Sequence, residues 1–159
     1  MTHGVTQVLF VCLGNMCRSP TAQGVFEAQV AAANRQDVIQ ADSAGTGAWH
    51  VGEPPDARAT AAALTRGYDL SAQRARQVTP EDFHRFQYVL AMDTDNLAQL
   101  EQMAPEDYSG HLGLLLDFHH DSPLREVPDP YYGGAQGFEQ VLDLIESAGE
   151  GLLAAIRHP

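Results

Sequence analysis

The chain has 159 residues, and its 44% hydrophobic and 19% charged residues are typical of one soluble globular domain, which we expect to span residues 1–159. Its net charge of −12 and its complete lack of lysine argue against nucleic acid and anionic membranes as partners. No stretch resembles a membrane span or a secretory signal, and the two cysteines make no disulfide framework. We therefore expect a cytoplasmic protein without membrane insertion.

The first predicted strand leads directly into the first predicted helix. Residues 7–12 form an apolar, β-branched run that suits a strand buried on both faces. A tight loop over residues 13–18 follows, and Ser19 and Pro20 resemble the N-cap and the first residue of a helix. The face that this helix is expected to bury contains Ala22, Val25, Phe26, Val30 and Ala33.

The middle of the chain predicts two further strands with helical segments between them. The second strand fits residues 38–44, and Asp56 is expected to cap an alanine-rich helix that ends at Gly67. A short helical turn opens at residues 79–80. The run YVLAM at residues 88–92 indicates the third strand.

The last part of the chain completes an alternation of strands and helices. A helix is expected over residues 93–103, a fourth strand over 112–116 and a long loop over 117–134. The final helix is expected to bury Phe138, Val141, Leu142, Ile145, Leu152 and Ile156. This alternation implies a single-domain α/β fold with a doubly wound, four-stranded parallel sheet flanked by helices. Ligands bind such sheets at the carboxyl ends of the strands, where the loop after the first strand lies.

That loop contains residues that suit phosphate chemistry. Arg18 lies six positions after Cys12, between the end of a strand and the start of a helix. The backbone N–H groups of such a turn can bind an anion, and Gly14 would let the backbone approach the ligand closely. Arg18 offers a planar fork for two phosphate oxygens. In this positive field we expect Cys12 to form a thiolate that can attack phosphorus.

Two other kinds of site fit these residues less well. A nucleotide-binding P-loop requires a lysine, and the chain has none. A zinc site would need ligands beyond the two cysteines, and the adjacent His119 and His120 lie in a polar loop. We therefore expect neither a metal nor a cofactor.

Several segments of the chain resemble those of the low-molecular-weight protein tyrosine phosphatases, in the order in which that family has them. Together they cover essentially the whole chain. They are VCLGNMCRSP at residues 11–20, SAGTGAWHVGEPPDARA at 43–59, ARQV at 75–78, AMDTDNL at 91–97 and DPYYGG at 129–134. The resemblance implies hydrolysis of phosphotyrosine and aryl phosphates through a phosphocysteine intermediate, with inorganic phosphate as product.

The resemblance also implies a role for three catalytic residues. Cys12 would be the nucleophile and Arg18 the phosphate clamp. Asp129, which lies between two prolines, would protonate the departing phenol and then activate water against the phosphocysteine. Because Asp129 must be protonated while Cys12 is ionised, we expect a mildly acidic activity optimum. The other residues of the phosphate-binding loop would be Leu13, Gly14, Asn15, Met16, Cys17 and Ser19.

Aromatic side chains would form the walls of the substrate pocket. Trp49, Tyr131 and Tyr132 would line a slot that a phenyl phosphate fills and a phosphoserine is too short to use. The residues expected to cap helices or form structural pairs, rather than touch substrate, are Asp56, Arg58 and Asp93.

Further residues resemble those that brace the loop in the family. Asn15 and Ser43 would hold its unusual backbone conformation, and the Ser19 hydroxyl would hydrogen-bond the thiolate. At Gln73 the chain departs from the family, because many members have a histidine there. Glutamine can still form hydrogen bonds, but it cannot carry a positive charge.

Cys17 has two interpretations. It could pack as a small apolar residue. It could also condense with a sulfenic acid at Cys12 into a disulfide, which would protect the nucleophile from irreversible oxidation.

Three other functions have to be weighed on the same scaffold. Thioredoxin-coupled arsenate reductases need another cysteine downstream, and none follows Cys17. Protein-arginine phosphatases usually carry threonine where Met16 stands and a smaller residue where Tyr131 stands, so these two residues favour phosphotyrosine. A catalytically silent phosphotyrosine-binding module or a redox sensor would not need the complete catalytic set.

The expected partner is a phosphotyrosine-bearing protein. In bacteria such enzymes often act on tyrosine kinases of exopolysaccharide export, so a bacterial tyrosine kinase is one example by analogy with the family. The acidic surface suggests that the partner's docking surface is basic.

Overall fold

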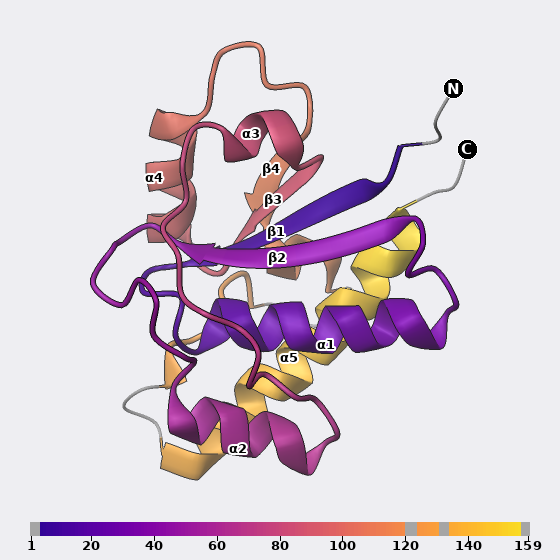
Figure 1. The fold of residues 1–159 in the computed structure, drawn as a ribbon, viewed down its shortest axis with the longest axis vertical. Helices are drawn as coiled ribbons and strands as arrows, with labels where there is room; N and C mark the ends of the chain where they lie inside the picture. The colour runs from indigo at the N-terminus through magenta and orange to yellow at the C-terminus, as the bar shows by residue number, and fades with distance from the viewer. Residues whose placement is uncertain (1–3, 120–123, 131–133, 157–159) are drawn as a thin grey trace.

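A computed structural model of the chain describes residues 4–119, 124–130 and 134–156, and four parallel strands form one sheet at its centre (Figure 1). The strand order is β2-β1-β3-β4, which confirms the predicted single-domain, doubly wound α/β fold. The strands are β1 Thr6–Cys12, β2 Ile39–Gly45, β3 Tyr88–Ala91 and β4 His111–Leu114. The helices are α1 Arg18–Ala32, α2 Ala57–Thr65, α3 Asp82–Arg85, α4 Thr94–Met103 and α5 Gly134–Ala155, with a 3-10 helix η1 at Leu115–Phe118.

Helices cover both faces of the sheet. α1 and α5 lie on one face, with α2 beyond them, and α3 and α4 lie on the other (Figure 1). Neighbouring residues of β1 point to opposite faces, as the pleat of a strand requires. Val8 and Phe10 therefore belong to the core cluster under α1 and α5, and Leu9 and Val11 to the cluster under α3 and α4. The prediction of a first strand buried on both faces is confirmed.

The end of β2 lies very close to the loop that follows β1. Cys12, the last residue of β1, pairs with Gly45, the last residue of β2. A β-carbon at position 45 would lie 2.8 Å from the carbonyl oxygen of Leu13 and 3.1 Å from the amide nitrogen of Asn15. Only glycine therefore allows the strand and the loop to approach this closely.

The predicted start of α1 was wrong in one respect. The helix begins at Arg18 with Cys17 at the N-cap position, and no side chain caps it. Ser19 lies within the first turn, and its hydroxyl contacts Cys12 and Asn15 instead. The far end of the predicted buried face was also wrong, because Ala33 is exposed and ends the helix.

The fourth strand is shorter than predicted, whereas the caps and the last helix agree with the sequence. β4 ends at Leu114, and the two apolar residues that follow belong to η1. Asp56 caps α2 and Asp93 caps α4 through side-chain hydrogen bonds to backbone amides. The residues predicted for the buried face of the final helix are all buried: Phe138, Val141, Leu142, Ile145, Leu152 and Ile156. The first five lie in α5, and Ile156 directly follows its last residue.

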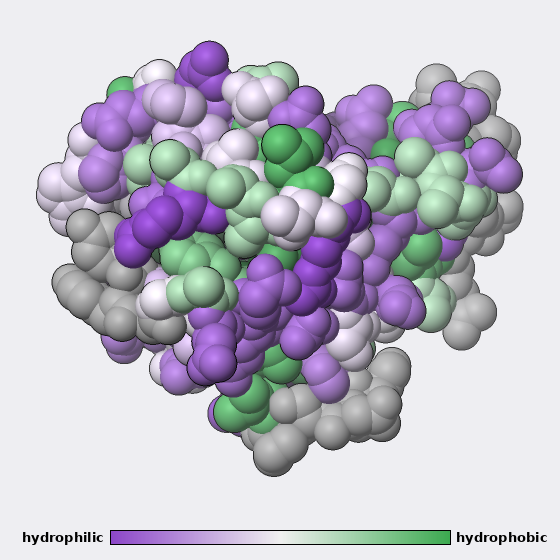
Figure 2. Space-filling view, turned by 90° about the horizontal axis from the view of Figure 1, so that it is seen from below, coloured by the Kyte–Doolittle hydropathy of each residue, from purple (hydrophilic) through white to green (hydrophobic). Residues whose placement is uncertain are grey.

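The surface seen from the α2 side is mostly hydrophilic, and its apolar residues form small separate patches (Figure 2). Across the parts of the chain that the structure describes, no helix combines the length and the apolar character that a membrane crossing requires.

Candidate active site

The loop between β1 and α1 is held by its carbonyl groups. Three of these carbonyl groups accept backbone hydrogen bonds of 2.9 Å from the segments that follow β2 and precede α2. The carbonyl of Cys12 accepts from the amide of Thr46, that of Leu13 from Gly47, and that of Met16 from Asp56. In a trans peptide the next N–H points opposite to the carbonyl. The amides of Leu13, Gly14 and Cys17 therefore point away from these segments, and all three residues line one pocket. Such a set of amides suits an anion.

Cys12 lies at the base of this loop, and the residue is only 3% exposed. Its Sγ is 3.0 Å from Oγ of Ser19. Asn15 has a left-handed backbone with φ of 57°, which a side chain normally disfavours. Its Nδ2 donates to Oγ of Ser19 at 2.8 Å and to Oγ of Ser43 at 3.0 Å, so hydrogen bonds hold the conformation. The backbone strain in the loop thus falls on Asn15, not on Gly14.

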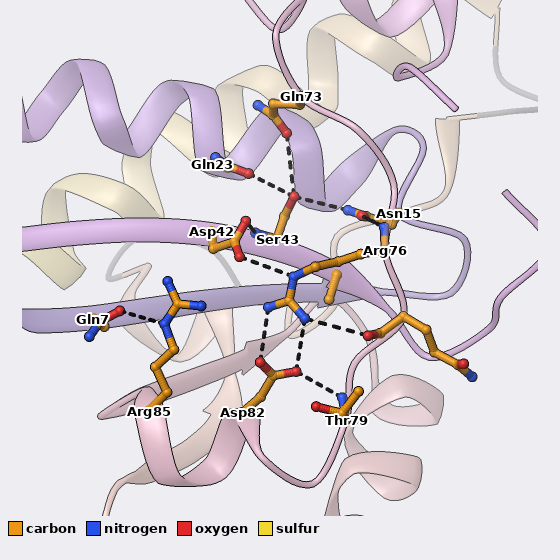
Figure 3. Close-up of polar contacts among 12 residues, drawn as sticks. Gln7, Asn15, Gln23, Asp42, Ser43, Gln73, Arg76, Thr79, Asp82 and Arg85 are labelled. Atoms are coloured by element: carbon orange, nitrogen blue, oxygen red, sulfur yellow. Dashed lines mark hydrogen bonds and ion pairs between the residues drawn. The ribbon is translucent and has the colours of Figure 1, made fainter. Parts of the chain in front are cut away.

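Two glutamines continue the network behind Ser43 (Figure 3). The Ser43 hydroxyl donates to Oε1 of Gln23 at 2.8 Å. Nε2 of Gln73 donates to the carbonyl of Pro20 at 3.0 Å, which leaves its Oε1 3.4 Å from the Ser43 hydroxyl. Gln73 therefore lies in the brace and contributes a side chain that does not titrate.

Arg18 is 6% exposed and keeps a charge in this buried place because acidic groups surround it. Its Nη1 donates to Oδ2 of Asp93 at 2.8 Å and to the carbonyl of Val127 at 3.0 Å. Burial opposes the charge, but the nearby Cys12, Asp93 and Asp129 outweigh it and raise the pKa of the guanidinium. The Arg18–Asp93 pair was missed from the sequence: a buried cation calls for an acidic partner, but nothing in the sequence says which acid it is.

A pocket of about 280 Å³ opens above Cys12 and is lined by Arg18, Trp49, His50 and Asp129 as well as by the loop. Trp49 is 69% exposed, so it lies at the rim of the pocket. The sequence did not single out His50, whose Nδ1 lies 3.1 Å from Oε1 of Glu53.

Two of the expected wall residues, Tyr131 and Tyr132, lie outside the described residues. Asp129 is exposed at the pocket's edge. Within the described ranges, no group of three or more His, Cys, Asp and Glu side chains could hold a metal ion.

Cys17 packs in a small cluster with Ala59 of α2 and Phe138 of α5. Both cysteines are free thiols. Burial, and after it the negative charges of Asp56 and Cys12, raise the pKa of the Cys17 thiol to about 12. Cys17 is therefore protonated at neutral pH.

Comparisons with known proteins agree with one another. The family model described as "Low molecular weight phosphotyrosine protein phosphatase" matches residues 7–159. The low molecular weight protein-tyrosine-phosphatase YfkJ of Bacillus subtilis is 44% identical over 150 residues, which cover 94% of this chain and 95% of that protein. Its crystal structure superposes with a TM-score of 0.90 over 96% of this chain and 95% of the other.

Two further crystal structures bear on the site. The protein tyrosine phosphatase of Entamoeba histolytica, with Hepes in its active site, is 40% identical with a TM-score of 0.90, over 94% of this chain and 95% of the other. A Drosophila arginine phosphatase is 34% identical with a TM-score of 0.87, over 93% of this chain and 96% of the other.

Proposed function

The chain belongs to the low molecular weight phosphotyrosine protein phosphatase family, and from that premise we propose that it hydrolyses phosphotyrosine in proteins, and aryl phosphates, through a phosphocysteine intermediate. One observation carries the proposal. The Cys12 thiol, hydrogen-bonded to Ser19, lies at the base of a pocket that also contains Arg18 and Asp129. These three side chains are a nucleophile, a phosphate clamp and a proton donor.

In the first step the Cys12 thiolate attacks phosphorus, and the bond from phosphorus to the phenolic oxygen breaks. The loop amides and the fork of Arg18 bind the phosphoryl oxygens and stabilise the charge that builds up on them. Asp129 donates its proton to the departing oxygen, so that a neutral phenol leaves. The product of this step is a phosphocysteine with Asp129 as carboxylate.

In the second step water attacks phosphorus and the bond from sulfur to phosphorus breaks. The Asp129 carboxylate takes the proton from water, and inorganic phosphate is released. The electron pair returns to Cys12 as thiolate, and the hydroxyl of Ser19, 3.0 Å away, donates to it. Both groups are then back in their starting protonation states.

Replacing Asp129 with asparagine is expected to lower kcat for phosphotyrosine by about 100-fold, because the leaving phenolate then receives no proton. The effect should be smaller on the first step with p-nitrophenyl phosphate, since nitrophenolate leaves readily without a proton. Rapid mixing should then show a burst of nitrophenol followed by slow turnover. Asp95→Asn, at another acid in the groove beside the pocket, is the matched control. Equal, small effects on both substrates would remove Asp129 from the mechanism.

A second candidate is the hydrolysis of phosphoarginine, which the similarity to the Drosophila arginine phosphatase supports. The experiment that tests the proposal is a set of parallel assays, with EDTA present, on peptides carrying phosphotyrosine, phosphoserine or phosphoarginine, and on arsenate with thioredoxin. We expect the phosphotyrosine peptide to have the largest kcat/KM. A larger value for phosphoarginine would favour the second candidate, and no phosphate release from any peptide would refute the proposal.

We further propose that Cys17 resolves an oxidised Cys12. Peroxide converts the Cys12 thiolate to sulfenic acid, and the Cys17 sulfur then displaces hydroxide to form a disulfide and, with the thiol proton, water. Burial and the charge of Asp56, which remain when Cys12 is a sulfenic acid, keep the pKa of the Cys17 thiol raised, so its thiolate fraction and the crosslinking rate should rise steeply, by up to about tenfold per pH unit, between pH 7 and 9. Mass spectrometry after a peroxide pulse checks this; Cys12 sulfonic acid alone at every pH would contradict it.

The cellular setting follows from the same chemistry. We propose that the protein acts in the cytoplasm, where a reducing environment keeps the two free thiols reduced. Its partner would be a phosphotyrosine-bearing protein, such as a bacterial tyrosine kinase.

A further inference from the structure

A backbone amide outside the loop orients the side chain of Asn15. The amide of Arg76 lies 3.0 Å from Oδ1 of Asn15 (Figure 3). A backbone N–H can only donate, so its partner must be the oxygen of the Asn15 amide and not the nitrogen. The nitrogen is therefore the atom that faces Ser19 and Ser43, and it donates to both.

The orientation of Asn15 in turn sets the direction of the hydrogen bond to the nucleophile. Because the Ser19 oxygen accepts from Asn15 at 2.8 Å, its own hydrogen is available as a donor. Two acceptors lie within reach, Sγ of Cys12 at 3.0 Å and the carbonyl of Ala44 at 3.4 Å. The closer acceptor is the sulfur, which binds the hydrogen most strongly as a thiolate.

The side chain of Arg76 fixes the position of this amide. Its Nε donates to Oδ2 of Asp42 on β2 at 3.1 Å, and its two terminal nitrogens donate to the two oxygens of Asp82 at 3.1 Å each. Asp82 is the first residue of α3 and is 5% exposed, and it also accepts from the amide of Thr79. The planar guanidinium thus joins β2 to the start of α3 (Figure 3).

Backbone hydrogen bonds place the same segment against the end of β2. The amide of Gly45 donates to the carbonyl of Arg76, and the amide of Val78 donates to the carbonyl of Gly45, both at 2.8 Å. Gly45 is also the residue that packs directly on the carbonyl of Leu13. The segment around Arg76 and the phosphate-binding loop therefore lie against the same strand end.

We propose that Arg76 is a positioning residue for the catalysis assigned above: its ion pairs with Asp42 and Asp82 fix the amide that orients Asn15, and thereby the hydrogen bond from Ser19 to Cys12. The expected effect of Arg76 on turnover rests on the proposed function. The effect of Arg76 on the ionisation of Cys12 can be measured without any substrate.

The test compares Arg76→Lys and Arg76→Met with a matched control, Arg85→Met. Arg85 lies in the same region, donates to Gln7 and has no hydrogen bond in the network of Asn15 (Figure 3). The main readout is the pH midpoint at which iodoacetate alkylates Cys12, because a misdirected Ser19 no longer stabilises the thiolate. The second is kcat and KM for p-nitrophenyl phosphate, and thermal melting reports folding.

For Arg76→Met we expect the alkylation midpoint to rise by about one pH unit and kcat to fall about tenfold. KM should change less than about threefold, because Arg18 and the loop amides still bind phosphate. Lysine keeps the charge but cannot pair with both carboxylates in one plane, so Arg76→Lys should have an intermediate effect. Arg85→Met should match the wild type. If Arg76→Met does not melt cooperatively, the alkylation midpoint and kcat of Arg76→Lys decide the test.

A double-mutant cycle separates positioning from general stability. In an Asn15→Ala background, the substitutions at Arg76 should no longer move the alkylation midpoint, because Asn15 transmits their effect. A shift that persists there, or a folded Arg76→Lys that alkylates like the wild type, would overturn the proposal. If the wild type hydrolyses no phosphotyrosine but the midpoints shift as expected, the proposed function fails and the positioning role stands.

Discussion

Replacing Cys12 with serine is expected to lower turnover of aryl phosphates by at least about 10,000-fold while the protein stays folded. A serine hydroxyl is not ionised at neutral pH. The side chain hydrogen-bonded to position 12 is the Ser19 hydroxyl, which is itself a donor and not a base that could take the proton. Oxygen is smaller than sulfur, so the buried site should accept the change.

Phosphate release from p-nitrophenyl phosphate measures the loss, and thermal melting shows that the fold is kept. The variant should still bind phosphotyrosine peptide, since Arg18 and the loop amides are unchanged. Calorimetry with that peptide therefore serves as the internal control. Turnover within about 100-fold of the wild type would mean that another group is the nucleophile.

Replacing Arg18 with lysine is expected to lower kcat/KM by about 1,000-fold. The guanidinium of Arg18 binds Asp93 and the carbonyl of Val127 through one terminal nitrogen, which leaves other N–H groups of the fork for phosphate. A lysine ammonium is compact, so it cannot hydrogen-bond Asp93 and two phosphate oxygens at the same time. We therefore expect weaker binding of phosphate and weaker stabilisation of the transition state.

The inhibition constant of inorganic phosphate measures the ground-state part of this loss, and kcat measures the rest. Arg74→Lys is the matched control, because Arg74 is exposed and donates to the carbonyl groups of Ser71 and Gln73 beside it in the chain. A variant at position 18 that binds phosphate as the wild type does and keeps its kcat would show that the loop amides alone form the clamp.

The sequence predicted the elements whose signals are local. β1 was recognisable because its apolar run has no polar face, and α2 and α4 because Asp56 and Asp93 stand directly before them. The apolar run around Leu115 was ambiguous, since a short apolar segment suits a strand or a helical turn equally well.

The start of α1 was misjudged for a different reason. Ser19 has the side chain of a good N-cap, but Cys12 and Asn15 occupy its hydroxyl, so the helix starts without a side-chain cap. A tertiary contact therefore overrode a local preference. The pairs of Arg18 with Asp93 and of Arg76 with Asp82 lie beyond sequence reasoning, because the chain has 21 acidic residues and any of them could be the partner.

The carboxylate of Asp93 serves two parts of the molecule at once. Its Oδ1 accepts the amide of Asn96 at the start of α4, and its Oδ2 accepts from Arg18 in the phosphate site. A bound anion that immobilises Arg18 also immobilises this carboxylate, and with it the first turn of α4. Local opening of that turn should then be rarer, so amide hydrogen exchange in α4 would sense whether the pocket is filled. Hydrogen exchange in α4 should thus report occupancy of the phosphate site, because Asp93 joins the first turn of this helix to Arg18.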